Sequence, residues 1–155
     1  MTHQQQMIAI LGCGADRWNA FRRRHAGSVV LHGVALAGAQ LPYADLHCAI
    51  LMESDLRRAN LAFAILERAV LRKSDFRDSD LRQADIRGAD LCGANLAGAD
   101  LRDASLGSCF LKRTDLRGAD LSTAQGLTED QIRDAVGDAH TKLPASLVRP
   151  AHWAP

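Results

Sequence analysis

A large hydrophobic residue returns at every fifth position along most of this chain. The series begins at Leu31 and runs without a gap to Leu121, which makes nineteen consecutive units. A small or β-branched residue, most often alanine, stands two positions before each of them, and neither column contains a charged side chain. A period of five fits neither an amphipathic helix, whose face recurs about every 3.6 residues, nor a flat strand, whose face recurs every second residue. Both columns can be buried only if the chain turns a corner once in each unit.

A chain that turns in this way forms a solenoid, in which stacked coils bury a core that no single unit could bury alone. The large and the small residue of each unit should point to the axis of the solenoid. The other three positions should face water. The predicted core therefore includes Leu51, Leu71, Phe76, Leu91 and Leu111.

The units at 84–88 (Ala-Asp-Ile-Arg-Gly) and 94–98 (Ala-Asn-Leu-Ala-Gly) resemble the pentapeptide repeat family, whose consensus is Ala-(Asp/Asn)-Leu-X-X. The resemblance covers about two thirds of the chain. It implies an all-β solenoid, a right-handed quadrilateral parallel β-helix with four units per coil, and hence about four to five coils here. We expect one structural domain with three parts. These are an N-terminal helical cap (1–27), the pentapeptide-repeat β-helix (28–125) and a C-terminal helix and tail (126–155).

The position before the central leucine supports the four-unit coil independently of the family. Asp or Asn usually occupies it, but apolar residues replace them at intervals of about twenty residues, with Asp90 as an interruption. Residues twenty apart would lie on neighbouring coils, so these side chains should form a stripe on one side of the rod. An exposed apolar stripe of this kind is typical of an interaction surface. This predicted apolar stripe consists of Val30, Ile50, Met52, Val70 and Phe110.

Three alternatives remain open for this stripe: it packs against a second copy of the chain, it packs against the chain's own C-terminal tail, or it is simply a tolerated surface. Tyr43 and Phe63, also twenty residues apart, form a predicted aromatic corner.

The residues before the repeats follow a different pattern. Met7 to Leu11 indicates a short helix, and 15–24 indicates a second helix with Trp18 and Phe21 on one face. The sequence Trp-Asn-x-Phe-Arg at 18–22 resembles the helical lead-in of many pentapeptide repeat proteins. Because an open β-helix end leaves backbone groups unpaired, we interpret this segment as a cap. The alternative is recruitment of a membrane or partner through the neighbouring run of three arginines.

After Leu121 the five-residue period ends. Thr128 and Gln131 match a capping box, which predicts a helix that continues to about Val136. The rest of the tail resembles the Gly-Leu-Thr…Leu-Pro…Arg-Pro-x-His-Trp ending of other bacterial repeat proteins of this kind. It is too apolar to stay in solvent, so we expect it to cap the far end or to lie along a side, with Trp153 in a hydrophobic seat.

Charge decides between two classes of partner. The formal net charge is +1, and residues 29–125 contain twelve basic and thirteen acidic side chains, a balance of −1. Some members of the family are implicated in quinolone resistance, because they imitate duplex DNA and bind DNA gyrase in its place. A phosphate mimic needs a strongly negative surface, so the DNA mimic is the alternative and not the first choice. Direct binding of nucleic acid is not expected either, because the chain has no positive field.

Six units contain the triplet Asp-apolar-Arg, which in a stacked solenoid gives parallel acidic and basic ladders. Exposed ion pairs contribute only about 0 to 1 kcal/mol each, so solubility and register are their expected roles. The alternative is that the arginine column Arg57, Arg77 and Arg117, with Arg58, binds an acidic partner.

Nothing in the sequence indicates an enzyme, a cofactor or a metal site. No Ser/His/Asp or Cys/His arrangement and no phosphate-binding glycine loop is recognisable, and His47 beside Cys48, with His32, does not make a closed ligand set. The apolar runs are too short for a membrane span or a signal peptide, so we expect a cytoplasmic protein. The predicted function is therefore a non-catalytic protein-binding module or scaffold, whose protein partner is unidentified and which forms a homodimer if the stripe packs against its own copy.

Overall fold

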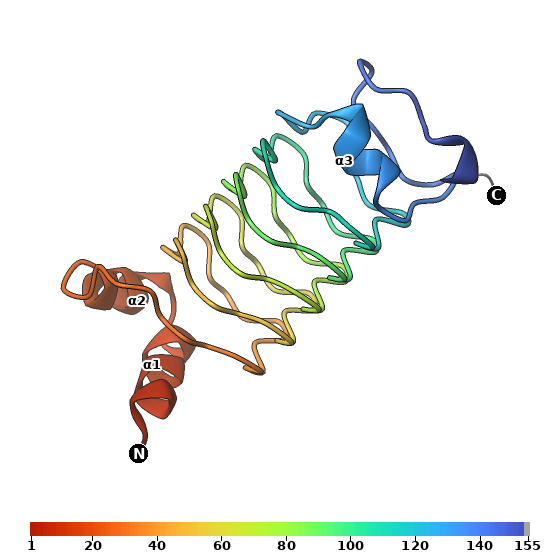
Figure 1. Ribbon diagram of the computed structural model, residues 1–155. Coiled ribbons are helices and arrows are strands. Elements are labelled where there is room, and N and C mark those ends of the chain that lie inside the picture. Colours follow the sequence, from red (N-terminus) through yellow and green to blue (C-terminus); the bar gives the residue numbers. More distant parts are fainter. Residues whose placement is uncertain (154–155) are drawn as a thin grey trace.

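The computed structural model describes residues 1–153, which form a rod of stacked coils with helices at both ends (Figure 1). The large and the small column both point to the axis of the rod. Leu51 and Phe76 have no exposed surface, and Leu71, Leu91 and Leu111 are at most 3% exposed. Because alanine lines the other half of the core, neighbouring sides of a coil can approach closely while the leucines fill the centre.

The coils are joined by parallel backbone bridges, each of which involves a single residue on either side. Every bridge within residues 30–125 pairs residues twenty positions apart, such as Val30 with Ile50 and Asp100 with Asp120. Four units of five residues therefore complete one coil, as the spacing of the apolar stripe predicts. The contact is confined to isolated bridges, because the chain turns again before a longer strand can form.

A left-handed residue makes the corner in most units. The second residue after the central leucine has a positive φ, for example 57° at Lys73 and 70° at Gly98. At this position, twelve residues other than glycine adopt the left-handed conformation. This conformation costs about 1 to 2 kcal/mol per residue in an isolated chain. The backbone hydrogen bonds to the coils on either side fix each corner and offset the free-energy cost of its left-handed residue.

Two helices cover the N-terminal end of the rod (Figure 1). Helix α1 spans His3–Gly12 and begins four residues before the predicted start at Met7, and helix α2 spans Ala15–Arg22, within the predicted 15–24. Trp18 is fully buried and Phe21 is half-buried beside it, with ring centroids 5.5 Å apart. These two aromatic residues place α2 against the open end of the first coil.

The polar residues of the Trp-Asn-x-Phe-Arg motif bind the backbone of the first coil. The Trp18 indole N–H donates to the Asp45 carbonyl at 2.6 Å. The Asn19 side chain accepts from the Asp45 amide at 2.8 Å and donates to the Tyr43 carbonyl at 2.9 Å. Groups that would pair with a further coil are thus satisfied by the helix, which is the physical task of a cap.

Arg22 belongs to the same cap. It is only 4% exposed, and its guanidinium donates to the carbonyls of His25, Gly27 and His47 at 3.1, 2.6 and 2.9 Å. The alternative of a basic run at 22–24 that recruits a membrane or a partner therefore loses its first member. A guanidinium enclosed by backbone carbonyls cannot contact a second molecule.

The C-terminal end is closed by α3, Glu129–Arg133, and by the tail after it. The Thr128 and Gln131 capping box is present as predicted, but the helix ends before Val136. The prediction of a longer helix was wrong because residues 134–136 pair with the last coil. The Arg113 amide donates to the Asp134 carbonyl at 2.8 Å, and Val136 bridges Asp115.

The tail continues as part of one more coil. Lys142 bridges Asp120, and the Thr141 hydroxyl donates to the Leu116 carbonyl at 2.9 Å, as the Thr114 hydroxyl does to the Leu91 carbonyl on an earlier coil. A short 3₁₀ helix η1 (Ala151–Trp153) then places Trp153, which is 1% exposed, over Gly137, where a Cβ atom would overlap the indole ring. No helix in the described part of the chain is long and apolar enough to cross a membrane.

Candidate interaction surfaces

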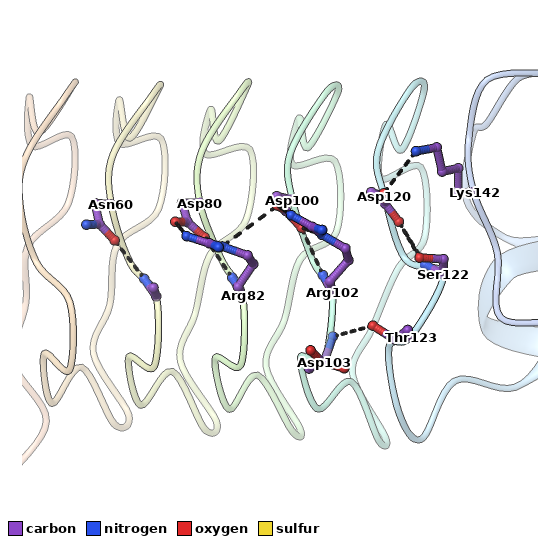
Figure 2. A network of polar contacts seen from close by, with 11 residues as sticks. Asn60, Asp80, Arg82, Asp100, Arg102, Asp103, Asp120, Ser122, Thr123 and Lys142 are labelled. Carbon is purple, nitrogen blue, oxygen red and sulfur yellow. Dashed lines mark hydrogen bonds and ion pairs between the residues drawn. The ribbon is translucent and has the colours of Figure 1, made fainter.

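The Asp and Asn residues before the central leucine have a structural role that explains why most units contain them. In each case the side-chain oxygen accepts a hydrogen bond from the backbone amide two residues later, as Asn60 does from Ala62 at 3.1 Å and Asp100 from Arg102 at 3.2 Å. This contact satisfies an amide in the turn that has no partner within the unit. Figure 2 shows Asn60, Asp80, Asp100 and Asp120 in a row on successive coils.

In six units the same carboxylate also binds the arginine two residues later. The guanidinium and carboxylate meet at 2.6 to 2.7 Å, and Arg82 reaches on to Asp100 of the next coil at 3.8 Å (Figure 2). The hydrogen bond from Arg57 holds the pKa of Asp55 at about 2, well below its ordinary value. The six pairs are Asp55–Arg57, Asp75–Arg77, Asp80–Arg82, Asp85–Arg87, Asp100–Arg102 and Asp115–Arg117.

These pairs neutralise the rod locally as well as in total. Arg57, Arg58 and Arg77 line a pocket of about 420 Å³ together with Asp78. Arg57 and Arg77 are already bound to their own aspartates, so an acidic partner would have to compete with two charge-assisted contacts. Binding of an acidic partner to this column stays a prediction with little support from the geometry.

The apolar stripe lies on one side of the rod, because Val30, Ile50, Val70, Asp90 and Phe110 form one continuous series of bridges. Val30 is 48% exposed and Phe110 is 61% exposed, while Ile50 and Val70 between them are half-buried. Half-buried Met52 belongs to the same side. The only charge in the series is compensated within the chain, because Arg72 binds the Asp90 carboxylate at 2.6 Å, which leaves the stripe electrically neutral.

The described part of the C-terminal tail, residues 126–153, does not cover this stripe. It closes the end of the rod, where Trp153 and Ile132 are buried, and Phe110 at the near end of the stripe stays largely exposed. Phe110 instead lines an open pocket of about 540 Å³ beside α3, with Cys109 and Gln131. The tail is therefore excluded as the occupant of the stripe.

The aromatic corner is a stacked pair. The rings of Tyr43 and Phe63 lie nearly parallel, at 10° and with centroids 4.7 Å apart, and the two residues are 60% and 39% exposed. Ile65, which the sequence analysis overlooked, is 41% exposed between Asp45 and Asp85 on another side of the rod. It shows that an isolated apolar residue occurs at this position outside the stripe as well.

The comparisons with known proteins agree with this geometry. Residues 54–93 and 94–125 match the family model described as pentapeptide repeats, in eight copies. Residues 54–125 are pentapeptide repeats. The bridges extend the repeat to Val30, before the matched residues, where the units depart from the consensus but keep both inward columns. No curated protein matches the chain.

Solved structures of pentapeptide repeat proteins resemble this one. Rfr23, a pentapeptide repeat protein from the cyanobacterium Cyanothece 51142, has 26% sequence identity to this chain. Its structure superposes with a TM-score of 0.53, and the match covers 81% of this chain and 97% of that chain. A pentapeptide repeat protein from the thylakoid lumen of Arabidopsis thaliana is 28% identical with a TM-score of 0.41, over 76% and 83% of the two chains. Full-length QnrB1, a plasmid-mediated fluoroquinolone resistance protein, is 17% identical with a TM-score of 0.40, over 77% and 87%.

The pentapeptide repeat also brings together a thiol and an imidazole that the sequence analysis considered only as an incomplete metal-ligand set. Cys48 Sγ lies 3.2 Å from His47 Nε2, and His47 Nδ1 lies 3.9 Å from a carboxylate oxygen of Glu67. The sequence places the two residues side by side but does not show that their side chains meet. Neighbouring residues seldom face one another in helices or strands, and only the corner between them allows this contact. Among residues 1–153, no group of three His, Cys, Asp or Glu side chains could hold a metal ion.

Proposed function

We propose that this pentapeptide repeat protein is a non-catalytic protein-binding module, a right-handed β-helix of four to five coils that binds a second copy of itself through the apolar stripe. Pentapeptide repeat proteins are typically structural or binding modules. The proposal rests on one observation, namely that the stripe residues replace an Asp or Asn whose side chain would satisfy a turn amide. Val, Ile and Phe offer no acceptor, so these units forgo a hydrogen bond and expose apolar surface in the same place.

Two features favour a second copy as the partner. The stripe is straight, because its members are successive bridge partners, so two rods can lie side by side along its length. A two-fold axis would place the same apolar surface on both sides of the contact. The Asp90 charge, already paired with Arg72, would not be left unpaired in such an interface. With few apolar side chains the contact falls below the size of a standard interface, so we expect a weak dimer.

Val70→Asp should shift this dimer to monomer. Aspartate is the commonest residue at this position, in nine of the nineteen units, so the fold should be kept while a charge enters the centre of the stripe. Sedimentation velocity over a concentration series should show association for the unmodified chain and about a tenfold or greater weakening for the variant.

A cytoplasmic location of the protein remains a prediction made from the sequence.

Ile65→Asp is the matched control. It makes the same chemical change at an equivalent position on another side of the rod, between Asp45 and Asp85. It should leave the association constant unchanged. If the unmodified chain stays monomeric at every concentration, the second copy is not the partner. If both variants weaken association equally, the stripe is not the interface.

The alternative, a DNA mimic that binds gyrase, has weaker support. A mimic must present unpaired negative charge at phosphate-like spacing, but the aspartate ladders are bound by arginines at 2.6 to 2.7 Å. We expect no effect on DNA supercoiling by gyrase at protein concentrations of about 1 to 10 µM, where a mimic with ordinary protein–protein affinity would act. Inhibition, or protection of gyrase from a quinolone, would reverse the order of the two proposals.

A further inference from the structure

The corner that contains His47 and Cys48 holds a set of groups that the interaction stripe does not use. The Cys48 thiol is half-buried and lies 3.2 Å from His47 Nε2. The other ring nitrogen of His47 faces Glu67 at 3.9 Å, and the side chains of His47 and Glu67 are 41% and 37% exposed. A nucleophile, a base and a carboxylate thus form one line of contacts at a partly exposed corner.

The backbone holds this line in place from several directions. Cys48 has a φ of 53°, in the left-handed region, where a cysteine is held only by its surroundings. The Cys48 amide donates to the Glu67 carbonyl at 3.0 Å, and its carbonyl accepts from the Ser28 hydroxyl at 2.8 Å. The buried guanidinium of Arg22 binds the His47 carbonyl at 2.9 Å. The thiol and the imidazole therefore meet because both ends of the corner are fixed, and not through a chance rotamer alone.

Several charged groups surround His47. Asp45 accepts from the His47 amide, Glu67 faces Nδ1, and Asp85 lies on the neighbouring coil. Arg87 lowers the pKa of Asp85 most strongly, by a hydrogen bond, and the positive charge of His47 adds to this. Two cations lie at the same corner, and Arg87 shares Glu67 with His47. Arg22 binds backbone carbonyls, and Arg87 binds Asp85 and Glu67.

Arg68 stands twenty residues after Cys48, at the equivalent corner one coil further along the rod, and both residues have a positive φ. In general, a positive charge beside a cysteine makes its sulfur more reactive.

We propose that Cys48 is a modification site at which His47 activates the thiol towards low-molecular-weight disulfides. The proton moves from Cys48 Sγ to His47 Nε2, and the sulfur then attacks one sulfur atom of the disulfide. The S–S bond of the reagent breaks, and the departing thiolate takes the proton from Nε2. The products are a mixed disulfide on Cys48 and one free thiol, and Glu67 acts as a positioning residue for the ring.

The other three cysteines provide internal comparisons. Burial raises the pKa of Cys109 to about 12, so its thiol should be unreactive. Burial and the neighbouring Asp90 raise the pKa of Cys92. Cys13 is exposed after α1 and provides the reference for an accessible thiol. Accessibility alone would make Cys13 react first, whereas activation by His47 would make Cys48 react first.

The test uses the full-length chain and the neutral chromogenic reagent dithiodipyridine, with the modified residue mapped by peptide mass spectrometry. We expect Cys48 to react first, at least about tenfold faster than Cys13. Cys48→Ser should remove this fast phase, and Cys13→Ser should keep it. Faster or equal labelling of Cys13 would overturn the proposal, and this comparison needs no variant that could misfold.

Variants of the neighbours then test the mechanism. His47→Gln should slow the labelling of Cys48 about tenfold and make it depend more steeply on pH between about 6 and 8.5. His32→Gln, a histidine of the same coil without a thiol beside it, should change neither. Glu67→Gln should move the pH profile part of the way towards that of His47→Gln, which a loss of packing alone would not do. An unchanged rate and pH profile in a folded His47→Gln protein would remove the role of His47.

Discussion

Phe76→Ala should lower the free energy of unfolding by about 3 to 5 kcal/mol, the usual range for an aromatic residue removed from a close-packed core. Phe76 replaces a leucine in the inward column and has no exposed surface. The coils stack through single-residue bridges, so the core beside Phe76 has little freedom to collapse into the space left by the ring. Because each coil contacts only its neighbours, the loss should also weaken the coupling between the two halves of the rod.

Phe63→Ala is the matched control for this measurement, because it removes the same atoms from a ring that is 39% exposed at the aromatic corner. We expect a change of about 1 kcal/mol, mainly the lost stacking on Tyr43. Denaturant titration followed by circular dichroism gives both values. Equal effects of the two substitutions would mean that the large column does not form the core.

Trp18→Ala should have an effect of similar size, about 3 to 5 kcal/mol, for a different reason. The substitution removes a fully buried ring and the 2.6 Å hydrogen bond to the Asp45 carbonyl. It also loosens α2 from the first coil, which exposes backbone groups that a further coil, or another chain, can pair with. We therefore expect the variant to aggregate through the end of the rod.

Trp18→Phe separates the two contributions. It keeps an aromatic ring in the core and loses the indole N–H, so the Asp45 carbonyl is left without this donor. A loss of about 1 to 3 kcal/mol is expected, smaller than for alanine.

The predicted aggregation of Trp18→Ala is measured by light scattering, with and without the additional substitution Val70→Asp. If the aggregation disappears when Val70→Asp is added, the copies associate through the apolar stripe and not through the end of the rod.

The five-residue period was enough to predict the interior of the rod. A column of leucines with a column of small residues two positions earlier can be buried only by a chain that turns once per unit, and Leu51, Leu71 and Leu91 lie inside accordingly. The spacing of twenty residues between Val30, Ile50 and Val70 also predicted which side chains would be neighbours, because in a solenoid the sequence distance fixes the spatial neighbour.

Sequence reasoning was less successful at the two ends, where the period stops. Arg22 resembled a member of an exposed basic run, but the carbonyls of the first coil enclose it. The capping box predicted where α3 begins, because the side chains next to it decide the start of a helix. It did not predict where α3 ends. That end depends on the pairing of residues 134–136 with Arg113 and Asp115, more than twenty residues earlier.

By itself, the sequence determined the repeat, the two inward columns, the four-unit coil and the series of residues in the apolar stripe. Each of these follows from local spacing, since a residue's position within its unit decides whether it points inward. Only the tertiary structure decided that the tail leaves the stripe uncovered, that Arg22 is buried, and that Cys48 faces His47 with Glu67 behind it. These contacts depend on the left-handed corner at Cys48 and on packing between coils and caps, neither of which the order of hydrophobic and polar residues specifies.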